Sequence, residues 1–342
     1  MGHSPRPDSR ARFTESVADD ARHRPDHPGA LLGGIADFVG RGLRAAAGGR
    51  GGSGRRHRHL DGAAGSAAGA GAYAMRWAAC LAVGLLSGCT ADIRPEAMVA
   101  GPPDVGAQER GAALMSRAVS AHGGRDHWLA AGPTAYTVHD VWQGLVGRLF
   151  NPWPEHDLRV RIVSTPGTDV VRALFLDGEA RCERWSFAGG RAEPDDDDPG
   201  FILPTMQYLL ELPFRVAEAP IVVDAGAVDV RGRRYERVLA TWGALEPHAD
   251  ADQWLLFLDA ETGRLAMAHF TVRSVTRGAT GTVLYGAFRD QDGITLAHEL
   301  TLTTADPADG EQDILHRVTV EAIVRGPHAA GADRCPRSPA SG

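Results

Sequence analysis

Histidines beside carboxylates are the residues of this sequence that could do acid–base chemistry. The pairs His139-Asp140 and His156-Asp157 each bring an imidazole next to a carboxylate, which are the groups that general acid–base catalysis uses. Neighbouring residues of a strand point to opposite faces, so neither pair forms a dyad by itself. His122 precedes two glycines, where a capping or packing role is favoured over that of a ligand or a base.

Four consecutive aspartates, residues 195–198, could supply oxygen ligands to calcium. They lack the alternating, glycine-containing pattern of a dedicated calcium loop, so a solvated acidic turn is favoured. No Cys/His cluster suggests zinc, and the nucleophile-elbow, P-loop, dinucleotide-binding and His-Glu-x-x-His motifs are absent from the sequence. We therefore predict no metal, no cofactor and no catalytic residue, because no nucleophile has a base at a recognisable spacing.

Cys89 lies in a more specific chemical context. Residues 75–88 begin with Met75-Arg76, continue with a short apolar run and end in Leu86-Ser87-Gly88, which is the order of a signal peptide. With Cys89 this ending fits the bacterial lipobox, in which the thiol takes a diacylglyceryl group and becomes the mature N-terminus. An apolar helix that ends at a glycine is the alternative. Two or more acyl chains would hold the protein stably on a membrane.

Such a signal works only at the start of a chain, but residues 1–74 precede it. We therefore expect Met75 to be the true start and residues 1–74 to be mis-assigned upstream sequence, disordered if made. The Arg/His run at 55–59 is the one feature that would favour a nucleic-acid-binding tail. Residues 75–342 carry 25 Arg against 36 acidic residues, a net charge of −11, so nucleic-acid binding by the folded part is disfavoured.

Two cysteines remain after the signal peptide, with Cys80, is removed and Cys89 is acylated. Cys182 lies in a strand-like run and Cys335 in a polar tail. They could pair in an oxidising compartment, and two free thiols are an equal alternative.

The folded part is expected to begin with helices. Residues 89–107 contain three prolines and predict an extended tether. Residues 108–121 have helical spacing and stop at His122-Gly123-Gly124, which suits a helix C-cap. A short helical turn follows at 125–130.

From residue 134 the chain becomes a series of apolar runs of period two, which indicates an antiparallel sheet. The run 253–259 is apolar on both faces, so we expect a central strand that is covered on each side. The expected strands are 134–143, 157–164, 169–177, 180–187, 221–230, 233–242, 253–259, 264–275, 280–289, 294–303 and 312–324. The predicted fold is α+β: a single curved antiparallel sheet, or incomplete β-barrel, with a few covering helices over residues 108–325 and a disordered tail at 326–342.

One helical segment, residues 201–214, is apolar nearly all round and must be covered. We expect it to lie as a lid on the concave face of the sheet over an apolar pocket, and a permanent plug is the alternative. The loop 150–154 is a second apolar segment that could lie at the same mouth. The expected ligand-binding residues are Met206, Leu209, Leu210, Phe214 and Trp128.

Five segments in order resemble the LolA/LolB-like superfamily of envelope lipoproteins, in a subgroup of unknown function. They are Ala121–Trp128, Tyr208–Phe214, Gly232–Val238, Trp254–Leu265 and Gly293–Leu296. The resemblance covers about residues 110–325. It implies a strongly curved, incomplete antiparallel barrel with an apolar interior that holds acyl chains or other apolar ligands in relatives. No residue specific to the carrier members is matched.

These features lead to one favoured hypothesis, a membrane-anchored bacterial envelope lipoprotein that binds a lipid or acyl chain in a half-barrel cavity. A hydrolase that uses His and Asp residues at the cavity mouth is one alternative, and a structural or assembly lipoprotein without a ligand is another. Thr90, rather than Asp, after the acylated cysteine favours the periplasmic face of the outer membrane.

Overall fold

The computed structural model describes residues 90–101, 103–329, 331–332 and 334–335. The predicted signal peptide, Cys89 and the stretch before them lie outside these residues. No described helix is both long and apolar enough to cross a membrane.

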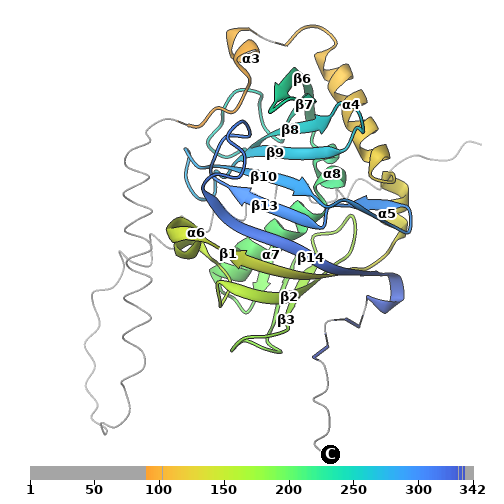
Figure 1. Ribbon diagram of the computed structural model, residues 1–342, viewed down its shortest axis with the longest axis vertical. Coiled ribbons are helices and arrows are strands. Elements are labelled where there is room, and N and C mark those ends of the chain that lie inside the picture. Colours follow the sequence, from red (N-terminus) through yellow and green to blue (C-terminus); the bar gives the residue numbers. More distant parts are fainter. Residues whose placement is uncertain (1–89, 102, 330, 333, 336–342) are drawn as a thin grey trace, which may run out of the picture.

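The described chain forms one α+β fold (Figure 1). Its strands are β1 (Thr134–Trp142), β2 (Asp157–Ser164), β3 (Val171–Phe175), β4 (Arg184–Ala188), β5 (Arg191–Glu193), β6 (Ile221–Val230), β7 (Arg233–Thr241), β8 (Gln253–Asp259), β9 (Leu265–Thr271), β10 (Thr280–Gly286), β11 (Arg289–Gln291), β12 (Ile294–Leu296), β13 (Glu299–Thr303) and β14 (Ile314–Arg325). Its helices are α3 (Glu96–Ala100), α4 (Ala107–Ala121), α5 (Arg125–Ala130), α6 (Gly144–Phe150), α7 (Asp197–Leu210) and α8 (Leu212–Arg215), with short 3₁₀ turns η1 (Val216–Glu218) and η2 (Gly326–His328).

Twelve strands form a single antiparallel sheet in the order β5-β4-β3-β2-β1-β14-β13-β10-β9-β8-β7-β6. The end strands β5 and β6 do not pair with each other, so the sheet is not closed, and the predicted incomplete barrel is confirmed. Bulges interrupt the pairing of β1 with β14 after Thr137 and that of β6 with β7 after Asp224. Because a bulge bends a strand and increases its twist, these interruptions help the long sheet to curve.

The sheet buries apolar side chains on both faces. The inner face, defined as the one that α7 and α8 cover, carries the main core, which includes Leu256 and Leu258 of β8. The outer face of β6–β9 carries a second core, which includes Leu255 and Phe257. Every residue of β8 is buried, which confirms the prediction of a central strand that is covered on each side.

Helix α4 lies along the sheet edge at β6 (Figure 1). A Cβ atom on Gly111 would lie 2.6 Å from the backbone nitrogen of Asp224, so only glycine permits this approach. The helix thereby covers an edge strand that would otherwise offer unpaired backbone groups to another chain.

Residues 91–98 pack on the outer face, although the sequence predicts an extended tether there. The backbone N–H of Ala91 donates to the carbonyl of Arg277 at 2.9 Å. Ile93 and Met98 are buried in the outer core. The segment is therefore not an extended tether. Its two apolar side chains, Ile93 and Met98, are buried on the apolar outer face of the sheet, and this burial holds the short helix α3 in place.

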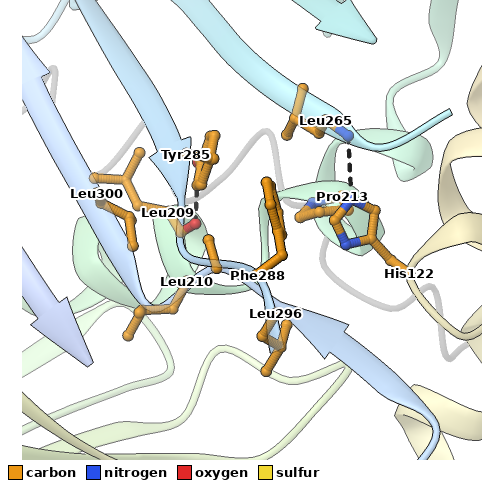
Figure 2. A pocket seen from close by; sticks show the side chains of 10 residues that line it. His122, Leu209, Leu210, Pro213, Leu265, Tyr285, Phe288, Leu296 and Leu300 are labelled. Carbon is orange, nitrogen blue, oxygen red and sulfur yellow. Dashed lines mark hydrogen bonds between the residues drawn. The ribbon is translucent and has the colours of Figure 1, made fainter. Parts of the chain in front are cut away.

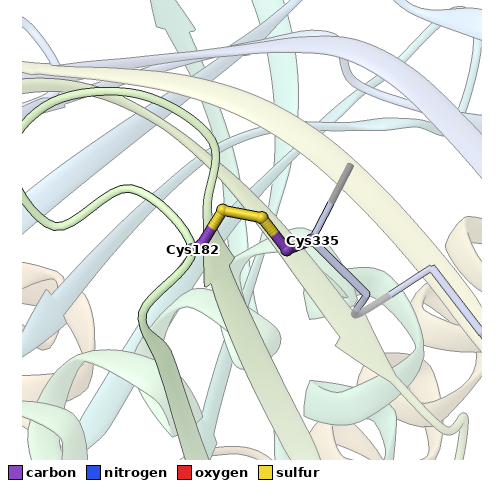
Figure 3. Close-up of a disulfide and its surroundings, with 2 residues drawn as sticks. All are labelled: Cys182 and Cys335. Atoms are coloured by element: carbon purple, nitrogen blue, oxygen red, sulfur yellow. A yellow bond between two sulfur atoms is a disulfide. The ribbon is translucent and has the colours of Figure 1, made fainter. Parts of the chain in front are cut away.

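The segment after β14 also packs against the sheet, although the sequence predicts disorder from residue 326. Ala329 is fully buried against Ala135 and Val163. Cys335 forms a disulfide with Cys182, with the two Cα atoms 5.3 Å apart (Figure 3). The sequence had left this pairing open, because partners separated by 153 residues carry no local signal.

Several local boundaries differ from the predicted ones. The expected strand 294–303 is split, because β12 pairs with β11 in a separate two-stranded sheet while β13 joins the main sheet. The buried His298 lies at the break, where its ring contacts the carbonyl of Val320 at 2.7 Å. Residues 180–183 form a turn in which Cys182 has a φ of 70°, so β4 begins later than expected. Helix α6 was not predicted.

Loss of the disulfide gives a stability prediction. Cys335→Ser is expected to lower the free energy of unfolding by roughly 2–4 kcal/mol under oxidising conditions, because the link restricts the unfolded chain. Urea unfolding measures this change. Cys182→Ser and reduced wild type should show the same loss, whereas unchanged stability with two free thiols in the native protein would contradict the assignment.

Candidate ligand-binding site

Helix α7 combines a polar start with an apolar body. The carboxylate of Asp196 accepts from the backbone N–H of Asp198, and acidic residues are favourable in the first turn of a helix. The aspartate run therefore starts this helix, four residues before the segment that the sequence predicted. The body is buried on several sides through Ile202, Leu203, Met206, Leu209 and Leu210.

A buried polar network interrupts the apolar segment where α7 ends. Glu211 is fully buried and accepts from Ser164 Oγ at 2.6 Å and from Arg215 Nε at 2.9 Å. Arg215 also pairs with Asp169 at 3.1 Å. Burial raises the pKa of Glu211, and the charge of Arg215 opposes that effect. The network fixes the corner between α7 and α8 to β2 and the loop before β3.

The space between this corner and the sheet is an apolar pocket (Figure 2). Its volume is only ≈ 10 Å³, about that needed by one water molecule. The hydroxyl of Tyr285 donates to the carbonyl of Leu209 at 3.1 Å and ties the end of α7 to β10. The pocket is therefore too small for a ligand in this structure. Its lining residues are His122, Leu209, Leu210, Pro213, Leu265, Tyr285, Phe288, Leu296, Ala297 and Leu300.

His122 joins three parts of the site. Its Nδ1 lies 2.8 Å from the carbonyl oxygen of Thr295, and its Nε2 accepts from the backbone N–H of Leu265 at 3.1 Å. A carbonyl only accepts, so the proton sits on Nδ1 and the ring is neutral. Burial lowers the pKa of His122 to about 4, and the charge of Arg264 acts in the same direction. This is the packing role that the sequence favoured.

The following glycine allows His122 to reach this position. Gly123 has a φ of 105°, and a Cβ atom there would lie 2.2 Å from the carbonyl oxygen of Gly293. The His-Gly-Gly sequence therefore brings the end of α4 directly against the loop before β12.

The five residues expected to bind a ligand lie in two places. Leu209 and Leu210 line the pocket. Met206, Phe214 and Trp128 are buried in the inner core, where the rings of Trp128 and Phe214 stack with centroids 5.0 Å apart. The sequence did not predict the strand residues of the pocket. The alternation of apolar and polar residues shows which face of the sheet a side chain lies on, but it does not show which strands lie side by side.

The two His-Asp pairs of the sequence are separated and paired differently. His139 Nε2 lies 2.7 Å from Asp157, and both side chains are exposed. Asp140 is fully buried and contacts His316 Nδ1 at 2.8 Å, a partner that the sequence did not indicate. The expectation that neighbours point to opposite faces is thus confirmed.

Asp140 also holds two indoles. Its second carboxylate oxygen accepts from Trp142 Nε1 at 3.1 Å and Trp153 Nε1 at 2.8 Å. The ring of Trp142 stacks on His316 with centroids 4.0 Å apart. Among the described residues, the hydrogen bonds of His316 include none to a Ser, Thr or Cys side chain. The arrangement clamps β1, β14 and the loop 150–154 together, and that loop lies in the core near Trp185.

No group of three potential metal ligands occurs within the described ranges. No protein-family model and no curated protein matches the chain.

Solved structures do match. A domain described as that of an outer membrane lipoprotein-sorting protein from Vibrio parahaemolyticus is 11% identical, with 64% of this chain and 94% of that chain covered and a TM-score of 0.40. A DUF1329 family protein from Desulfovibrio piger is 8% identical, with 64% and 93% covered and a TM-score of 0.39. A LolA superfamily protein from Nitrosomonas europaea is 9% identical, with 58% and 92% covered and a TM-score of 0.36.

Two of these descriptions name the kind of protein that the sequence motifs resemble. TM-scores below 0.5 carry no information on ligand or partner. The function is therefore argued from the residues of this chain.

The buried His122 predicts a pH dependence of stability. Its pKa is about 4 when folded, against 6.5 for an unperturbed histidine. Its contribution to stability is therefore complete above pH 6.5 and is lost as the pH falls towards 4. The free energy of unfolding falls by as much as about 3 kcal/mol over this pH range. His122→Gln keeps a donor and an acceptor but does not titrate.

Urea unfolding at pH 7 and pH 5 measures the effect. The variant should lose less stability on acidification than wild type. The contributions of the other buried histidines are the same in both proteins and cancel in this comparison. Equal losses in the two proteins would contradict a neutral, buried His122.

Proposed function

We propose that this protein is a membrane-anchored envelope lipoprotein that binds an acyl chain or another apolar molecule between α7 and the inner face of the sheet. The observation that carries the proposal is the apolar pocket at the end of α7. Leucines from α7 and from several strands meet there around a space that excludes charged side chains. Burial of each ligand methylene in such a space contributes about 0.8 kcal/mol.

A ligand must displace protein atoms, because the pocket has room for only about one water molecule. The attachments of the α7–α8 element are unequal. The corner at Glu211 is held by buried charged groups, whereas the preceding turn is held by neutral hydrogen bonds, from the Tyr285 hydroxyl to Leu209 and from Gln207 to the carbonyl of Thr168. Phe288, which is only partly buried, borders the same space. We therefore infer that the end of α7 and the Phe288 loop separate while the Glu211 corner stays in place.

The anchor completes the proposal. Cys89 lies two residues before Ala91, whose backbone is hydrogen-bonded to the loop after β9. Two residues span at most about 7 Å, so an acylated Cys89 would hold this part of the domain close to the membrane. The residue after the cysteine, Thr90, supports the periplasmic face of the outer membrane as the location.

A charge in the pocket tests the ligand site. Leu209→Asp is expected to weaken binding of a hydrophobic dye or of lauric acid by at least about tenfold, because a buried carboxylate is unfavourable beside an apolar ligand. Tyr285→Phe removes the tie to α7 and should strengthen binding. Fluorescence titration measures both changes.

Leu145→Asp is the matched control, because Leu145 is 85% exposed and lies on α6. It should bind like wild type. Wild-type affinity in folded Leu209→Asp, together with no change in Tyr285→Phe, would refute this site.

The anchor has its own test. Cys89→Ser is expected to give an unprocessed or soluble protein, because the hydroxyl cannot take the diacylglyceryl group. Cys80→Ser, within the predicted signal peptide, should be processed normally. Membrane fractionation and intact mass measure the outcome, and recovery of Cys89→Ser in the membrane at wild-type level would contradict the proposal.

A further inference from the structure

Four aromatic side chains form a cluster under α7 on the inner face. We call Tyr208, Trp242, Trp254 and Phe270 the aromatic cluster. Tyr208 comes from α7, and its ring centroid lies 5.1 Å from that of Trp254 and 6.1 Å from that of Trp242. Trp254 stacks on Phe270 at 4.5 Å. Strands β8 and β9 supply Trp254 and Phe270, and Trp242 follows β7 directly.

Three polar atoms of this cluster are buried without a hydrogen-bond partner. They are the hydroxyl of Tyr208 and the Nε1 atoms of Trp242 and Trp254, none of which meets an acceptor among the described residues. Trp254 is only 7% exposed. An indole N–H can only donate, and burial raises the pKa of Tyr208 well above its usual value, so the phenol stays protonated. Unpaired buried donors are rare because they lose their bonds to water.

Four other aromatic donors of the inner face are paired. The Nε1 atoms of Trp142 and Trp153 donate to Asp140, and that of Trp185 donates to Glu183 at 2.9 Å. Tyr285 donates to a backbone carbonyl. Three of the seven buried side-chain polar atoms without a partner among the described residues therefore lie in the aromatic cluster, beside the end of α7.

The charges around Tyr208 restrict the ligand group that could accept these bonds. Arg215 is already paired with Glu211 and Asp169. The positive charge of Arg215 has the largest charge effect on Tyr208, and the negative charges of Glu218 and Asp252 oppose it. The surroundings therefore show no net preference for an anion, and a neutral carbonyl oxygen accepts hydrogen bonds there without adding a charge.

We infer that the aromatic cluster binds the neutral ester group of an acyl ester, whose two oxygens accept hydrogen bonds from the Tyr208 hydroxyl and from the indole N–H groups of Trp242 and Trp254. The inference rests on the proposed function. Tyr208 precedes Leu209, which lines the apolar pocket, so the proposed separation at the end of α7 uncovers both. The hydrocarbon chain then occupies the pocket and its ester group meets the donors.

Three probes of equal chain length test this inference: methyl laurate, laurate and dodecane. Wild type should bind methyl laurate most tightly in competition with a hydrophobic dye. The double variant Tyr208→Phe/Trp254→Phe keeps two rings but removes two donors. It should bind methyl laurate about tenfold more weakly, as the loss of hydrogen bonds implies, and dodecane unchanged. Without ligand its thermal midpoint should be equal to or higher than that of wild type.

Trp185→Phe is the matched control, because it removes an indole that is already paired. It should keep the preference for methyl laurate and lose stability. Equal affinity of wild type for methyl laurate and dodecane, or a double variant that loses stability but no ester affinity, would overturn the inference and leave the proposed function intact. Failure to bind any of the three probes would overturn both.

Discussion

Burial of an apolar helix against one face of an open sheet is the interaction on which the rest of the structure depends. Helix α7 buries side chains on several sides, so it cannot lie on the surface, and the open sheet offers it an apolar face to cover. Each large side chain removed from water contributes on the order of 1.5–3 kcal/mol. The other helices then complete the fold, with α4 at the β6 edge and α3 on the outer face.

Polar groups decide how tightly this helix is held. At one end the buried Glu211–Arg215 pair fixes the corner, and removal of either partner would leave a buried charge uncompensated. In the preceding turn the polar attachments are neutral hydrogen bonds, from Tyr285 to the carbonyl of Leu209 and from Gln207 to the carbonyl of Thr168. Each such bond contributes only about 1 kcal/mol net. A small pocket that is bordered by buried charged pairs on one side and by neutral hydrogen bonds on the other can open on the neutral side without loss of the fold.

The sequence predicts the parts of this arrangement that depend on local pattern. Period-two runs identified the antiparallel sheet, and the doubly apolar run around Leu256 identified its central strand. Contacts between distant strands could not be predicted from the sequence. The alternation of apolar and polar residues shows the face of the sheet on which a side chain lies, but not which strand lies next to it. The pairing of Asp140 with His316, the Cys182–Cys335 disulfide and the strand residues of the pocket all depend on such long-range register. The i, i+4 spacing of Glu211 and Arg215 in an apolar segment was the one available local signal for the buried network.

The most direct test of a ligand site beneath α7 is paramagnetic relaxation in methyl-labelled protein. A fatty acid with a nitroxide on its chain should broaden the methyl signals of Leu209, Leu210 and Leu300, which line the pocket. It should spare Leu239 and Leu255, which are buried on the outer face. Broadening confined to exposed residues such as Leu145, or equal on both faces of the sheet, would contradict the account.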